Sequence, residues 1–249
     1  MRKVMDWAGV PAAFAVAIVV NGLANALPLG GKSTGEVSAL YESLITPAGF
    51  TFAIWSLIYL WLLVYVIFQA LPAQRDSQLL ASVGKWFIIS CVFNAAWMFC
   101  WHYLQIELSV IMMLGIFYSL IKINLLLSRQ SLTPQMYWCV SIPFSIYVGW
   151  ITVATIANLS GLQTAWDANS LWLSAIDWTL LKLAIAGFLG AVVALTRLNA
   201  PYVLVIAWAA NGIAAKQIGT AAVSGAATTL SILAILIAVY VIFRRLRPE

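Results

Sequence analysis

Eight apolar stretches constrain what this chain can fold into more than any other feature. Because backbone groups in hydrocarbon must bond internally and no alternating strand pattern occurs, such stretches indicate helices that cross a bilayer. The charged fraction of 8% supports this, since soluble domains carry about 25%. The sequence therefore predicts an all-α membrane protein. The predicted spans lie at residues 7–28, 50–71, 85–104, 108–127, 137–159, 177–196, 201–217 and 221–243.

The seventh stretch is the weakest, because Asn211, Gly212, Lys216 and Gln217 interrupt it. Eight spans still fit the distribution of basic residues best. With a cytoplasmic N-terminus, ten of the 13 Lys and Arg residues fall on the cytoplasmic side, including the C-terminal Arg-rich end. We therefore expect both termini to be cytoplasmic, in the inner (plasma) membrane of a bacterium. The net charge of +5 follows from this topology and predicts no nucleic-acid partner.

An alternative concerns the N-terminus, where a basic start, an apolar run and residues 24–26 also match a signal peptide with its cleavage motif. Cleavage would leave seven helices and a cytoplasmic C-terminus. Asp6 and the length of the run favour a retained helix.

Metal and acid–base chemistry receive no support from the sequence. The three cysteines lie inside predicted spans, and His102 is the only histidine, so no Cys/His spacing predicts a metal site. His102 and Glu107 lie at the predicted outer rim. We predict no catalytic residue, no metal and no resident cofactor.

Four tryptophans suggest a site instead. Trp97 and Trp101 share one face of their helix, and Trp55 and Trp150 fall at a comparable depth of two other spans. All four would lie beneath the polar loop 29–49. An aromatic core is the plain interpretation, and a pocket lined by rings with a few polar groups is the functional one.

Two asparagines accompany these rings. Asn94 lies three residues before Trp97, and Asn158 lies eight residues after Trp150, so each shares a face with its tryptophan. A buried amide in hydrocarbon is costly without a partner, so we expect bonds to neighbouring helices or to a ligand. For Asn21 and Asn25 in the first span, helix packing is favoured over pocket lining.

The character of the chain changes after Asn158. Residues 160–176 form a predicted polar loop, and the three spans beyond it are rich in Ala and Gly, as in tightly packed membrane helices. We therefore divide the chain into a five-helix bundle at 1–165 and a three-helix transmembrane extension at 166–249. The extension offers a surface for a homodimer or another membrane partner.

Three motifs in residues 1–165 resemble the TspO/MBR family of translocator proteins, also called tryptophan-rich sensory proteins. The first is a loop and helix start, LYESL at 40–44 followed by PAGFTFAIW at 47–55. The second is FNAAW at 93–97, and the third is WITVATIAN at 150–158. The chain departs from the family at Leu40, Ala48 and Phe50, and its last three helices indicate a long, eight-helix branch.

The resemblance implies a five-helix bundle whose pocket binds planar hydrophobic molecules such as porphyrins, sterols and benzodiazepine-like drugs. By position, Trp97, Trp150, Ala154 and Asn158 match pocket residues of the family. Together with the depth argument, this gives Trp55, Asn94, Trp97, Trp101, Trp150, Ala154 and Asn158 as predicted ligand contacts.

Three functions follow as hypotheses. The leading one is a membrane binder or sensor of a planar apolar ligand, a tetrapyrrole or similar molecule, held by ring stacking. The second is a tryptophan-dependent catalyst of porphyrin degradation, which some bacterial family members are reported to be. The third is a transporter or a membrane subunit of a larger assembly, although no ionisable residue lies near the midplane of a predicted span.

Overall fold

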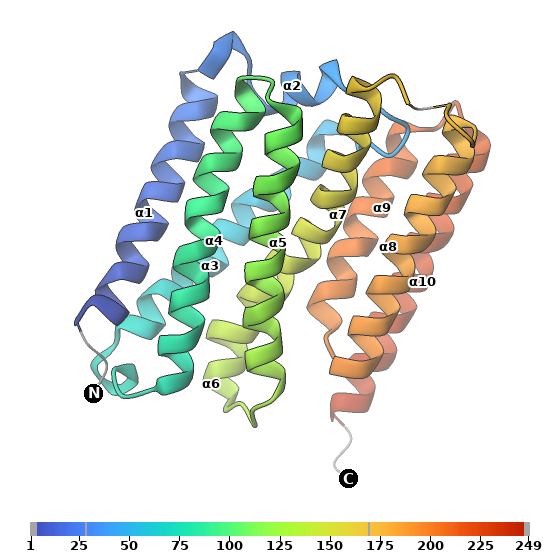
Figure 1. The fold of residues 1–249 in the computed structure, drawn as a ribbon. Helices are drawn as coiled ribbons and strands as arrows, with labels where there is room; N and C mark the ends of the chain where they lie inside the picture. The colour runs from blue at the N-terminus through green and yellow to red at the C-terminus, as the bar shows by residue number, and fades with distance from the viewer. Residues whose placement is uncertain (1–3, 28, 169, 247–249) are drawn as a thin grey trace. The chain divides into compact units, whose positions relative to one another are not determined.

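The computed structural model describes residues 4–27, 29–168 and 170–246, and all regular structure among them is helical (Figure 1). This confirms the all-α class. The long helices are α1 (Val4–Ala26), α3 (Ile54–Ala70), α4 (Gln78–His102), α5 (Ile106–Ser128), α7 (Ile142–Ala165), α8 (Ala175–Arg197), α9 (Ala200–Lys216) and α10 (Ala221–Leu246). Short helical segments are η1 (Leu29–Gly31), α2 (Thr34–Leu40), η2 (Gly49–Ala53), η3 (Pro72–Gln74), α6 (Pro134–Met136) and η4 (Tyr137–Ser141).

Seven helical segments of the described chain are long and apolar enough to cross a membrane. They correspond to all predicted spans except 201–217, which falls in α9. That helix has 17 residues, at the short end of the range for a spanning helix.

The contacts divide the chain into two compact units. Unit 1 contains residues 1–37 and 55–148, and unit 2 contains residues 38–54 and 149–249. Because α7 continues through the boundary, its first turns belong to unit 1 and the rest to unit 2. Each unit therefore combines two separate stretches of the chain. The predicted division at residue 165 cuts the chain once, and it stays a prediction.

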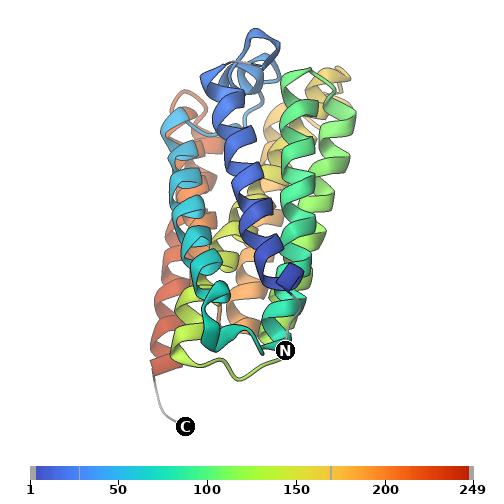
Figure 2. The same cartoon turned by 90° about the vertical axis from the view of Figure 1, so that its left-hand side faces the viewer.

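In unit 1, α4 packs against both α1 and α5, and the short turn after His102 makes α4 and α5 antiparallel neighbours (Figure 1, Figure 2). Three fully buried rings from three helices form the centre: Tyr65, Phe87 and Phe144. Their ring centroids lie 4.8–5.6 Å apart in edge-to-face geometry. Such pairs contribute about 0.5–1.5 kcal/mol each beyond burial.

The entry to α7 is irregular. Residues 137–141 form a π-helical turn, and Pro143 is the second residue of α7. Proline cannot donate to the carbonyl four residues earlier, so the regular bonding ladder widens before it. The Asn124 side chain donates to the Phe144 carbonyl at 3.4 Å and ties this turn region to α5.

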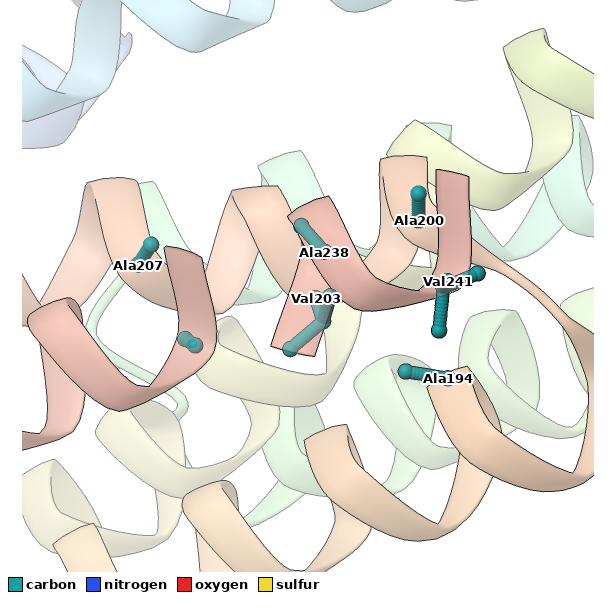
Figure 3. Packing of buried hydrophobic residues seen from close by; sticks show 7 residues of the cluster. Ala194, Ala200, Val203, Ala207, Ala238 and Val241 are labelled. Carbon is teal, nitrogen blue, oxygen red and sulfur yellow. The ribbon is translucent and has the colours of Figure 1, made fainter. Parts of the chain in front are cut away.

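In unit 2, helices α8, α9 and α10 pack on one another through small side chains. Figure 3 shows one cluster, in which alanines and valines of the three helices meet: Ala194, Ala200, Val203, Ala207, Ala234, Ala238 and Val241. Small residues allow the helix backbones to approach closely, as the Ala/Gly composition predicts. A serine adds to the contact, since Ser231 Oγ donates to the Ala207 carbonyl at 3.1 Å.

The predicted polar loop at 160–176 is wrong for its first six residues, because α7 continues to Ala165. Ser160 Oγ donates to the Ile156 carbonyl at 2.9 Å, and Thr164 Oγ1 donates to the Ser160 carbonyl at 3.1 Å. These bonds to the preceding turn satisfy the hydroxyls, so polar residues continue the helix. The predicted loop 29–49 likewise contains helical turns, η1 and α2.

Candidate ligand-binding site

The tryptophan pair of α4 is the first part of the predicted site that the structure brings together. The rings of Trp97 and Trp101 stack with centroids 5.6 Å apart and an interplanar angle of 19°. Both side chains are buried. Their spacing of four residues produces this stack, because side chains at i and i+4 lie above one another on a helix.

Asn94 lies on the same face of α4 and is 2% exposed. Its Oδ1 accepts a bond of 2.7 Å from Asn21 Nδ2, which also donates to the Ala17 carbonyl at 2.8 Å. This bond joins α1 to α4, as expected of a buried amide. Because Oδ1 is occupied, the side chain of Asn94 presents its NH2 group to the rest of its surroundings.

Trp55 occupies the first turn of α3. It stacks on Tyr59 with centroids 5.5 Å apart and meets Tyr147 of α7 edge-on at 6.2 Å. Tyr59 lies within electrostatic range of Cys91 of α4 and of Tyr147, and Tyr147 in turn is within range of Asn94. The ring contacts join α3 to α7, and Tyr147 of α7 lies near Asn94 on the polar face of α4.

We call six of these unit 1 residues the aromatic cluster: Trp55, Tyr59, Asn94, Trp97, Trp101 and Tyr147. Three of its buried polar atoms have no hydrogen-bond partner among the described residues, namely Tyr59 Oη, Asn94 Nδ2 and Trp97 Nε1. Tyr147 lies beside Asn94 but does not satisfy hydrogen-bond geometry with its Nδ2. An unsatisfied buried donor costs about 1–3 kcal/mol, so a hydrogen-bond acceptor placed beside these donors would stabilise the cluster.

The segment after α1 is fixed to the end of α4 by His102, which is 1% exposed. Its Nδ1 donates to the Leu29 carbonyl at 3.2 Å, because a carbonyl can only accept, and its Nε2 forms a hydrogen bond of 3.0 Å with Thr34 Oγ1. Trp101 Nε1 donates to the Thr34 carbonyl at 3.2 Å. Gly30 has φ +62°, and a Cβ there would lie 2.6 Å from the His102 carbonyl oxygen. The segment is thus bound both to the histidine and to one ring of the stack.

A capping box starts α2 in this segment. The Ser33 amide donates to Glu36 Oε2 at 2.7 Å, and the Glu36 amide donates to Ser33 Oγ at 3.3 Å. The bonds from the Ser33 backbone and hydroxyl hold the pKa of Glu36 below its ordinary value of 4.5. The carboxylate is therefore charged at neutral pH and completes the helix start.

The other predicted residues lie in unit 2, on α7. Trp150 is 3% exposed and meets Phe52 of η2 edge-on, with centroids 6.0 Å apart. Ala154 and Asn158 follow at intervals of four residues, and Asn158 is buried. The seven predicted contacts are thus divided, with four in the aromatic cluster and these three in unit 2.

Sequence reasoning missed two members of the cluster, Tyr59 and Tyr147, and favoured helix packing over pocket lining for Asn21. Tyr59 lies four residues after Trp55, and Tyr147 lies three before Trp150, so helical spacing from the predicted tryptophans could have found both. Asn21 does join two helices, as its packing interpretation requires, and the same bond also orients Asn94.

The described residues contain no group of three or more His, Cys, Asp or Glu side chains arranged to hold a metal ion. What the fold presents is a set of apolar helices of spanning length and a buried cluster of rings with unpaired donors. These features define an integral, multi-pass membrane protein.

A family model described as "TSPO-like protein" matches residues 7–243. The chain belongs to this TSPO-like family. The match confirms the resemblance seen in the motifs and extends it beyond residue 165, through the last three helices. Neither the comparison with curated proteins nor the comparison with solved structures gives a match.

Proposed function

We propose that the protein binds or senses a planar apolar ligand bearing hydrogen-bond acceptors, a tetrapyrrole or similar molecule, in the aromatic cluster of unit 1. The observation that carries this proposal is the pair of buried, unpaired donors at Trp97 Nε1 and Asn94 Nδ2. They are separated by one helical turn on one face of α4, and the first belongs to a stacked ring pair.

The donors indicate the polarity of the ligand. An indole nitrogen can only donate, and the amide oxygen of Asn94 is already bonded to Asn21. An acceptor on the ligand, such as a carbonyl, a carboxylate or a ring nitrogen, would satisfy both groups. Buried donors without water nearby gain more from such a bond than exposed ones do.

The rings indicate the shape. Two stacked pairs, Trp55 with Tyr59 and Trp97 with Trp101, present aromatic faces that favour a flat partner. Each additional stacking contact contributes about 0.5–1.5 kcal/mol beyond burial, so a few contacts and one hydrogen bond add to the affinity that burial of the apolar ligand supplies. Trp150, Ala154 and Asn158 stay predicted contacts, tested by Trp150→Leu in the assay below.

The experiment is a titration of the full-length protein in detergent with protoporphyrin IX, followed by porphyrin absorbance so that losing a tryptophan does not remove the signal. Trp97→Phe keeps a ring but deletes the donor, and Asn94→Leu deletes the amide. Each should weaken binding about three- to tenfold, the net value of one hydrogen bond. Chromatography of the porphyrin after incubation in light and in darkness tests for turnover in the same samples.

The matched control is Trp138→Phe, because Trp138 belongs to the same unit but is 56% exposed. Its dissociation constant should equal that of the wild type. Equal constants for wild type, Trp97→Phe and Asn94→Leu would refute the site, and no saturable binding by the wild type would refute the ligand class.

A further inference from the structure

We infer that α9 of the extension acts as a positioning element that holds residues 42–53, the segment leading directly into Trp55. This inference rests on the proposed function for its consequence, since Trp55 belongs to the aromatic cluster. Its structural part stands on contacts within unit 2 alone.

Four kinds of contact join α9 to the 42–53 segment. Lys216 Nζ pairs with Glu42 Oε1 at 2.7 Å, and the Ala48 amide donates to the Gly212 carbonyl at 3.0 Å. Ile45 packs into a buried apolar cluster that includes Ile213 and Ala214 of α9. The fourth contact is made by Trp208.

Trp208 is bound to the segment by both its ring and its nitrogen. Nε1 donates to the Thr51 carbonyl at 2.9 Å, and the ring meets Phe50 edge-on with centroids 5.6 Å apart. The contacts recur at positions 208, 212 and 216, which are one helical turn apart. One face of α9 is thus complementary to the segment along its length.

The fit is closest at Gly212. A Cβ atom there would overlap the Thr51 hydroxyl and lie 2.9 Å from Thr51 Cγ2. Only glycine allows η2 to approach α9 so closely, and Thr51 is fully buried in consequence. The next aromatic residue of the segment, Phe52, is held edge-on to Trp150.

Residues 42–53 are fixed to α9 within unit 2, and the chain runs on from this segment through Ile54 into Trp55. Loosening the segment should disorder the entry to Trp55 and speed ligand release, while the α8–α10 packing is unchanged.

Gly212→Ala is the direct test, with Gly225→Ala as its matched control. Both glycines lie in helices of unit 2, so both substitutions improve helix propensity, but a Cβ at Gly225 meets nothing within 4 Å. Amide hydrogen exchange of the full-length protein in nanodiscs is measured across residues 42–53. We expect exchange at Ala48 and Thr51 to accelerate by about tenfold or more in Gly212→Ala, and not in Gly225→Ala.

Reversing the charges of the Lys216–Glu42 ion pair tests the N-terminal end of the segment. Lys216→Glu should raise the amide hydrogen-exchange rate near Glu42, and adding Glu42→Lys should return the rate to the wild-type value. Unchanged exchange in both Gly212→Ala and Lys216→Glu would overturn the inference.

The functional consequence is read separately, as the release rate of protoporphyrin IX. Faster release in Gly212→Ala alone supports positioning, and unchanged release despite accelerated exchange overturns it. If the wild type binds no porphyrin, the proposed function fails, while the exchange measurement still decides whether α9 holds the segment.

Discussion

The two compact units use opposite kinds of packing. Unit 1 centres on large aromatic rings in edge-to-face contact, such as Tyr65, Phe87 and Phe144. The α8–α10 helices of unit 2 meet through alanine side chains that are almost fully buried, such as Ala194 and Ala238. Lipid tails are as apolar as these side chains, so the hydrophobic effect favours neither kind of packing in a bilayer. The two units therefore differ in the geometry of their side-chain contacts.

We propose different roles for the two units on this basis. Aromatic rings suit a flat ligand, and the cluster of unit 1 also carries unpaired donors. Alanine packing brings the backbones of α8, α9 and α10 close together, and α9 in turn contacts residues 42–53.

The largest effect should come from deleting a central ring of unit 1. Phe87→Ala removes contacts with Tyr65 and Phe144 and leaves a cavity, lowering the free energy of unfolding by about 3 kcal/mol or more. Unfolding in mixed micelles measures it. Phe99 of the same helix is 45% exposed, so Phe99→Ala should change the free energy of unfolding by about 0.5 kcal/mol at most. Equal losses would contradict the contrast between ring core and lipid-facing surface.

Enlarging an alanine should damage unit 2 in the opposite way. Ala238→Leu adds atoms where α8, α9 and α10 meet, and overpacking of this kind costs about 1–3 kcal/mol. Ala222→Leu, on an exposed position of the same helix, is the control and should be neutral. If both variants unfold at the same denaturant fraction, close packing is not what holds the three helices.

Two polar substitutions should differ in stability and in binding. Ser231→Ala deletes the bond to the Ala207 carbonyl and should cost about 0.6 kcal/mol, the mean for interhelical bonds in membranes. Asn21→Leu deletes the bond to Asn94 and leaves a buried amide oxygen without its partner, so it should cost about 1–3 kcal/mol. Only Asn21→Leu should weaken porphyrin binding, because it frees the Asn94 amide to rotate. Weaker binding in Ser231→Ala would break the separation of roles.

The smallest effect concerns pH at the capping box of α2. Because the folded pKa of Glu36 is lowered, its contribution is fully present above the unfolded value near 4.5 and is lost as pH falls through the folded pKa. The Ser33 amide signal in NMR spectra should therefore shift between pH 5 and pH 3. Glu36→Gln should abolish the shift, and a shift that survives this substitution would assign it to another group.

The apolar pattern alone predicted the helices well, since length and hydropathy decide a bilayer span. Boundaries were missed where polar side chains satisfy themselves locally. Ser77 Oγ accepts from the Leu80 amide and starts α4 at Gln78, seven residues before the predicted start at 85. Ser160 and Thr164 extend α7 by bonding to the preceding turn.

The candidate site was predicted in part. Spacing along one helix was sufficient for the Trp97–Trp101 stack, because it depends only on helical geometry. Contacts between helices could not be derived from one sequence, so the bond from Asn21 to Asn94 and the edge-on contact of Trp55 with Tyr147 came only from the structure. The contact of α9 with residues 42–53 was also missed: Gly212 interrupts an apolar stretch and belongs to a small-residue packing surface, but neither feature of the sequence names Thr51 as its partner.

The central claim is that Trp97 Nε1 donates to a planar ligand, and the indole N–H signal of Trp97 tests it most directly. NMR spectra of the ¹⁵N-tryptophan-labelled protein are recorded during a protoporphyrin IX titration, with Trp97→Phe assigning the signal and exposed Trp138 as the internal control. The account predicts a saturable downfield shift of the Trp97 N–H and an unchanged Trp138 signal. Saturable binding with an unmoved Trp97 N–H would contradict it.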